Sequence, residues 1–144
     1  MMFRGPLFTE KDLVDLLSFI KDKDFSIKDG SGIIEEFESS FGQYLNAKHA
    51  LATNNGTSAI HSALFGLGLQ KGDEVIVPCF GWHACISPML QMGIRPVFCN
   101  IDQKTYNIDP DDAVKKITEK TKAIFVIHLF GHPADMDSIM GSEK

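Results

Sequence analysis

The stretch "ATNNGTSAI" at residues 52–60 places two asparagines and a glycine between small residues, and two hydroxyl side chains follow the glycine. The preceding "HALATN" predicts a short strand, and the pattern after the turn predicts a helix over residues 57–67. The first N–H groups of a helix have no partner within it, and the helix dipole adds partial positive charge there. Gly56 would let the backbone approach an anion closely, and Thr57 and Ser58 would add hydroxyl donors. The stretch therefore predicts an anion-binding helix start, with an ordinary helix cap as the alternative.

The rest of the chain alternates between helical and strand patterns. Apolar runs predict buried strands at 72–78, 95–102 and 122–131. Helical spacing and capping residues predict helices at 9–22, 33–45, 82–92 with an interruption at Pro88, 109–117, and from "ADMDSIM" onward. Strands that are apolar throughout and separated by helices favour a parallel sheet covered on both faces. The predicted fold class is α/β, with three αβα layers and a mostly parallel sheet.

Composition narrows the possible classes of protein. The chain has 144 residues, of which 44% are hydrophobic and 23% charged, as in ordinary globular domains. A net charge of −5 without a Lys/Arg run argues against a nucleic-acid surface. The longest apolar run, "AIFVIHLF" at 123–130, is too short to span a bilayer, so no membrane partner is expected. The first residues contain no apolar segment of signal-peptide length, which predicts a cytoplasmic protein.

The cysteines are odd in number and scattered. Cys79, Cys85 and Cys99 suit reduced thiols in a reducing compartment. Cys79 and Cys85 flank His83, but their spacing lacks the short Cys-x2-Cys pair that structural zinc sites use. We therefore expect buried free thiols and no metal site.

Four sequence blocks carry a family resemblance. They are "FESSFGQYLNAKHALATNNGTSAIHSAL" at 37–64, "GDEVIVPCFGWHACISPML" at 72–90, "RPVFCNIDQKTYNIDP" at 95–110 and "AIFVIHLFGHPADMD" at 123–137. In this order they resemble the N-terminal part of the DegT/DnrJ/EryC1/StrS family of sugar aminotransferases. The resemblance implies a pyridoxal phosphate (PLP) enzyme of fold type I with an incomplete large domain. It implies an N-terminal helical arm over residues 1–35 and the first portion of the PLP-binding domain over residues 36–144.

The resemblance also assigns the candidate site residues. The family binds the cofactor phosphate at a loop that matches Gly56, Thr57 and Ser58, as the helix-start argument predicts separately. Trp82 falls where the family stacks an aromatic side chain on the pyridine ring, although a lone Trp more commonly anchors a core or an interface. Asp135 falls where the resemblance predicts a carboxylate paired with the pyridine nitrogen.

The family's cofactor-binding lysine has no counterpart here. In the family it lies in a Ser-rich loop beyond "ADMD", whereas this sequence stops at Lys144, which lacks that loop. No catalytic residue is therefore assigned. We expect a split aminotransferase, completed by a C-terminal chain that carries the lysine, in a homodimer or heterotetramer. A truncated product is the alternative.

The reaction that the resemblance implies is transfer of an amino group from an amino acid such as glutamate to a keto sugar, with a nucleotide-linked sugar expected. One alternative is a PLP-dependent sugar dehydratase of the same family, in which histidine replaces the lysine. Another is a non-catalytic binding module. A nucleotide-binding domain is disfavoured because no Gly-x-Gly-x-x-Gly or P-loop follows a strand.

Overall fold

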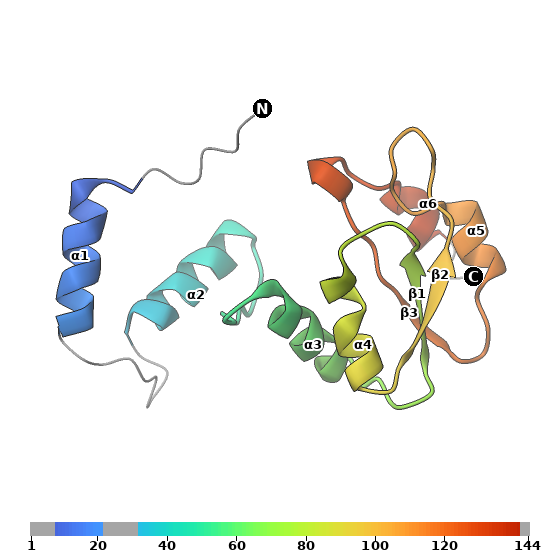
Figure 1. Cartoon of the computed structure of the whole chain (residues 1–144), viewed down its shortest axis with the longest axis horizontal. Helices are drawn as coiled ribbons and strands as arrows, with labels where there is room; N and C mark the ends of the chain where they lie inside the picture. The colour runs from blue at the N-terminus through green and yellow to red at the C-terminus, as the bar shows by residue number, and fades with distance from the viewer. Residues whose placement is uncertain (1–7, 22–31, 142–144) are drawn as a thin grey trace. The chain divides into compact units, whose positions relative to one another are not determined.

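The computed structural model describes residues 8–21 and 32–141, and it divides the chain into two compact units, residues 1–52 and 53–144 (Figure 1). The first unit contains α1 (Glu10–Lys21) and α2 (Ile33–Tyr44), which confirms the helices predicted at 9–22 and 33–45. The domain boundary predicted between residues 35 and 36 falls inside α2. It stays a prediction, while the division between the two units lies after Ala52.

The second unit is built on a three-stranded parallel sheet. Its strands are β1 (Glu74–Pro78), β2 (Arg95–Cys99) and β3 (Thr121–Ile124), in the order β2-β1-β3. Every residue of the central strand β1 is buried, including the charged Glu74, as a strand between two covering layers requires. The three predicted strands are confirmed, but β3 is shorter than the predicted 122–131.

The strand predicted from "HALATN" is wrong, because residues 49–54 contain no strand. A strand needs a neighbouring strand for its backbone hydrogen bonds, and both edges of β1 are already paired. The amide of Ala52 instead donates to Glu38 Oε1 at 2.7 Å, which ties this segment to α2 within the first unit.

Helices cover both faces of the sheet and produce the predicted three layers (Figure 1). Val75 and Val77 of β1 pack toward α3 (Gly56–Gly66) and α4 (Ser87–Gln91). Ile76 points the other way, toward α5 (Pro110–Lys115) and α6 (Met136–Met140). This alternation follows from the two-residue period of a strand. One cluster of buried residues lies on the α3/α4 face, comprising Leu64, Leu69, Val75, Val77, Met89 and Ile94. The other lies on the α5/α6 face, comprising Ile76, Cys99, Ile108, Ala113, Ala134 and Ile139.

The predicted interruption of the 82–92 helix is confirmed. A short 3-10 turn, η1 (His83–Cys85), precedes α4, and Pro88 lies in the first turn of α4. Proline has no N–H to continue a helix, but it is well suited to the first turn, where that N–H would be unpaired. None of the helices in the two described ranges is long and apolar enough to cross a membrane.

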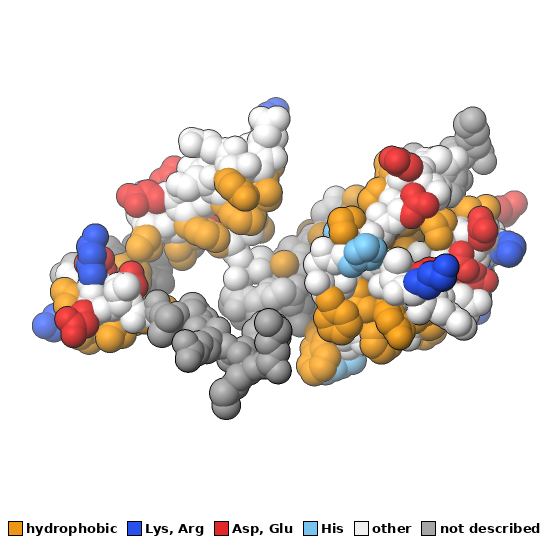
Figure 2. Space-filling model, turned by 90° about the horizontal axis from the view of Figure 1, so that it is seen from above, with side chains coloured by type: hydrophobic (Ala, Val, Ile, Leu, Met, Phe, Trp, Pro, Cys, Tyr) orange, Lys and Arg blue, Asp and Glu red, His pale blue; other side chains and the backbone are white. Residues whose placement is uncertain are grey.

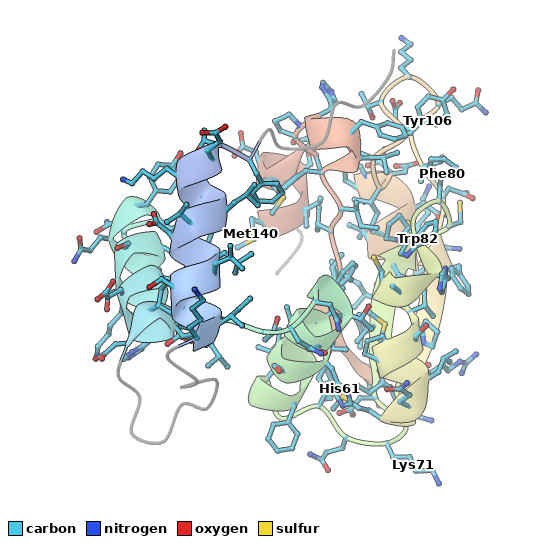
Figure 3. All side chains as sticks on the ribbon, turned by 60° about the vertical axis from the view of Figure 1, so that its left-hand side comes forward. His61, Lys71, Phe80, Trp82, Tyr106 and Met140 are labelled. Atoms are coloured by element: carbon cyan, nitrogen blue, oxygen red, sulfur yellow. The ribbon has the colours of Figure 1, made fainter. Side chains whose placement is uncertain are left out.

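Three loops follow the carboxyl ends of the strands and therefore lie at one edge of the sheet. They are residues 79–82 after β1, 100–109 after β2 and 125–135 after β3. The start of α3 lies near the same edge, because α3 packs on β1 and on η1 and then connects to the start of β1 through a short turn. In Figure 3, Phe80, Trp82 and Tyr106 lie toward this end of the unit, and Lys71 lies toward the other.

Candidate functional site

The start of α3 carries two backbone donors without a partner. Asn55 is the N-cap, with an extended backbone, and its Oδ1 accepts a hydrogen bond from the Ser58 amide at 2.9 Å. Thr53 Oγ1 supports this turn by donating to the Asn55 carbonyl at 2.9 Å. Among the described residues, the amides of Gly56 and Thr57 have no acceptor. The ordinary helix cap is therefore present, and two further amides at the same helix start are left unpaired, as the predicted anion site would require.

The hydroxyls and the glycine at this helix start are free to face a ligand. Thr57 and Ser58 are half-buried, and within the described part of the chain their hydroxyls have no hydrogen-bond partner. Gly56 is exposed and has no positive φ, and a Cβ on it would meet no atom within 4 Å. Neither backbone strain nor internal packing accounts for this glycine. Open space, two amides and two hydroxyls suit a phosphate monoester.

Trp82 lies in the loop after β1, directly before η1. Its side chain is 70% exposed, and its ring centroid lies 4.8 Å from that of His83. Because α3 packs on η1, Trp82 and the start of α3 belong to the same face of the sheet (Figure 3). A pocket of about 380 Å³ adjoins Trp82, and apolar side chains such as Ile86, Leu90, Phe98 and Phe125 line much of it. An exposed indole beside an apolar hollow can stack on a flat heterocycle.

Asp135 has a different environment. It is the N-cap of α6, where Oδ1 accepts from the Ser138 amide at 3.1 Å and Oδ2 accepts from the Ser138 hydroxyl at 2.7 Å. The bond from the Ser138 hydroxyl, followed by that from the Ser138 amide, holds the pKa of the Asp135 carboxyl below its usual value. Asp135 ends the 125–135 loop, at the same edge of the sheet as Trp82, while α6, which it caps, packs on the face opposite to α3. Its pairing with a pyridine nitrogen stays a prediction.

The three thiols differ in environment, although all were expected to be buried. Cys79 is exposed and Cys85 half-buried, and only Cys99 is fully buried. Burial, with the neighbouring Asp112 carboxylate, raises the pKa of the Cys99 thiol to about 12. Across residues 8–21 and 32–141, no cluster of three or more His, Cys, Asp or Glu side chains has metal-binding geometry.

Sequence reasoning missed three residues that shape this edge of the sheet. Asn55 caps α3, while Tyr106 and Asn107 connect the loops there. An Asn directly before a helix is a recognisable capping signal. The contacts of Tyr106 and Asn107 join segments far apart in the sequence, so no local pattern marks them.

Comparison with known proteins agrees with this architecture. Residues 10–143 match the DegT/DnrJ/EryC1/StrS aminotransferase family, and the chain belongs to that family. It forms part of the large domain of a fold-type I enzyme, and this membership indicates PLP as the cofactor.

Three relatives show the range of proteins that the chain resembles. GDP-perosamine synthase from Escherichia coli O157:H7 is 40% identical over 111 residues, which cover 77% of this chain and 30% of that protein. The solved aminotransferase from Psychrobacter cryohalolentis is 36% identical with a TM-score of 0.85, over 95% of this chain and 34% of that one. The E. coli GDP-4-keto-6-deoxy-D-mannose-3-dehydratase was solved with bound hydrated PLP and is 28% identical to this chain, with a TM-score of 0.84. The match covers 96% of this chain and 36% of that one. The chain thus spans about 30% of the length of the curated relative.

Proposed function

We propose that this chain supplies the phosphate-binding and ring-stacking part of a PLP-dependent sugar aminotransferase. The observation that carries the proposal is the start of α3. Two unpaired amides, at Gly56 and Thr57, adjoin two unpartnered hydroxyls, at Thr57 and Ser58, on the same face of the sheet as Trp82. A helix start of this kind is suited to the cofactor phosphate.

The residues of this chain would bind and orient the cofactor. The amides of Gly56 and Thr57 and the two hydroxyls would donate to phosphate oxygens, and the Trp82 indole would lie against the pyridine ring. PLP, when bound, supplies the electron sink that amino-group transfer requires. Asp135 remains the candidate for the ring nitrogen on family resemblance, but its contacts with Ser138 favour a helix-capping role.

The proposed reaction moves an amino group from an amino acid such as glutamate to a keto sugar, with a nucleotide-linked sugar as the favoured class. The similarity to GDP-perosamine synthase supports a sugar substrate. We propose that the cofactor-binding lysine comes from a complementing segment outside these 144 residues, in a cytoplasmic homodimer or heterotetramer.

A second candidate function is sugar dehydration with the same cofactor. It is favoured by the likeness to the E. coli dehydratase, whose TM-score of 0.84 is close to the 0.85 of the Psychrobacter aminotransferase. The two reactions would share the phosphate and stacking residues described above. Product analysis of the completed enzyme with a keto sugar and glutamate separates them, since only the aminotransferase puts nitrogen on the sugar.

The phosphate assignment can be tested by titrating the purified chain with pyridoxamine 5′-phosphate, whose amine cannot attach to surface lysines. Thr57→Val keeps the shape of the side chain and removes its hydroxyl, so affinity should fall by about 1–3 kcal/mol. Ser62→Ala is the matched control, because it removes an exposed hydroxyl from the same helix beyond its first turn. Equal affinities for wild type and Thr57→Val would reduce the stretch to a plain helix cap.

A further inference from the structure

The loop between β2 and α5 is a hydrogen-bonded hairpin, which we call the 100–109 hairpin. Ile101 and Ile108 form an antiparallel bridge across it. Asp102 Oδ1 accepts from the Lys104 amide and from the amide and hydroxyl of Thr105, at 2.8–3.0 Å. These bonds hold the pKa of the Asp102 carboxyl below its usual value, and the bond from the Thr105 amide has the largest effect. The hairpin therefore has an internally fixed shape at the edge of the sheet where Trp82 lies.

The tip of this hairpin contains a residue in a strained conformation. Tyr106 has a φ of 60°, in the left-handed region where glycine would be free of strain. Its ring lies against Phe80, with centroids 5.9 Å apart and an angle of 46° between the planes (Figure 3). Phe80 precedes Trp82 by two residues in the 79–82 loop. The ring contact offers a reason for a tyrosine at a position that the backbone alone would give to glycine.

The next residue anchors the hairpin to the rest of the unit. Asn107 is only 4% exposed, and its Oδ1 accepts from the Leu129 amide at 3.0 Å. Its Nδ2 donates to the carbonyls of His132 at 3.0 Å and Pro133 at 3.1 Å. Both amide hydrogens and the carbonyl of this side chain are thus bonded to one loop, residues 129–133. A buried and fully bonded amide of this kind fixes the relative position of two segments.

We propose that Tyr106 and Asn107 are positioning residues for Trp82. Asn107 anchors the 100–109 hairpin to the 129–133 loop, and Tyr106 extends from the anchored hairpin to hold Phe80 and hence the Trp82 loop. Trp82 itself is largely exposed and, apart from the ring of its neighbour His83, has no aromatic side chain against it among the described residues. These contacts of Asn107, Tyr106 and Phe80, which we call the brace, would hold the indole of Trp82 in its stacking position before a cofactor binds. The inference rests on the proposed function, because it assigns Trp82 the stacking role.

Two variants break the brace at different points. Tyr106→Gly suits the left-handed backbone and removes only the ring contact, so the hairpin should keep its fold. Asn107→Ala removes the anchor. Asn100→Ala is the control, because the Asn100 side chain is exposed and has no bond within the described residues.

Trp82 is the only tryptophan of the chain, so its fluorescence reports directly on the brace. Time-resolved anisotropy should show faster local motion of Trp82 in Tyr106→Gly and Asn107→Ala than in wild type and Asn100→Ala. Affinity for pyridoxamine 5′-phosphate should fall about three- to tenfold in Tyr106→Gly, while the melting temperature stays near that of wild type.

Unchanged Trp82 anisotropy in Tyr106→Gly would overturn the brace, even if Asn107→Ala proves too unstable to purify. A wild-type chain that binds no pyridoxamine 5′-phosphate would overturn the proposed function instead. In that case the anisotropy comparison would still decide whether the hairpin restrains Trp82.

Discussion

The Oδ1 atom of Asn55 lies 2.9 Å from the backbone nitrogen of Ser58 and accepts its hydrogen bond. This pairing withdraws one amide from the first turn of α3 and leaves those of Gly56 and Thr57 for a ligand. The side chain that stabilises the helix also limits how many backbone donors an anion can reach.

Substitutions of Asn55 should separate helix stability from phosphate binding. Asn55→Ala removes the cap and should lower the free energy of unfolding by about 1 kcal/mol. Asn55→Asp keeps a capping oxygen but adds negative charge a few ångströms from the phosphate, so affinity for pyridoxamine 5′-phosphate should fall about tenfold with stability retained. Urea unfolding and ligand titration measure the two effects. Undiminished affinity in Asn55→Asp would place the phosphate elsewhere.

Fluorescence of Trp82 should respond to the ring of the cofactor and not to phosphate alone. Pyridoxamine 5′-phosphate should quench the emission, because its ring would stack on the indole. Inorganic phosphate should leave the emission unchanged but shift the titration to higher ligand concentration, by competing at the start of α3. Quenching by inorganic phosphate itself would indicate a conformational change in place of stacking.

Two substitutions of Asp135 distinguish its two candidate roles. Asn is as good an N-cap as Asp, so Asp135→Asn should preserve stability, whereas Asp135→Ala should cost about 1 kcal/mol. If the carboxylate pairs with the ring nitrogen, Asp135→Asn should lower turnover of the completed enzyme far more than cofactor binding. The resemblance leads us to expect this large loss of turnover, since the capping bonds to Ser138 leave lone pairs on both carboxylate oxygens. Full turnover in Asp135→Asn would leave Asp135 with the helix-capping role alone.

Alkylation of the cysteines should follow their burial. At pH 8 iodoacetamide should label the exposed Cys79 and leave the buried Cys99 unmodified, because a thiol with a pKa of about 12 stays protonated. Since the folded pKa of Cys99 is raised from 9.0, its contribution to stability should be lost as the pH rises from about 9 toward 12. Peptide mass spectrometry locates the label. Rapid labelling of Cys99 in the folded chain would contradict the buried assignment.

Sequence patterns correctly predicted the elements that depend on residues close together in the chain. The apolar run of β1, the helix after Gly56 and the interruption at Pro88 are all confirmed. The "HALATN" strand failed because strand formation depends on a partner, and the apolar pattern carries no information about one.

The sequence also located candidate site residues, whose roles stay predictions. The start of α3 and Trp82 could be located from the turn and the resemblance, and the structure places them on one face of the sheet. The packing of α6, which Asp135 caps, on the opposite face depends on which way the chain crosses the sheet, which residue spacing does not reveal. The bonds of Asn107 join residues 22 to 26 positions apart, so they too depend on the tertiary fold.

Pro96, the second residue of β2, limits the side on which the sheet can be extended. Arg95 donates its amide to Asp73 on the β1 side at 2.8 Å, and successive amides along a strand point in opposite directions. The nitrogen of Pro96 therefore faces the outer edge of β2, where it has no hydrogen to donate. A further strand added at that edge would lack one of its hydrogen bonds, whereas β3 contains no proline. Addition of a strand, whether from the same protein or from another associating chain, is therefore favoured beyond β3 and disfavoured beyond β2.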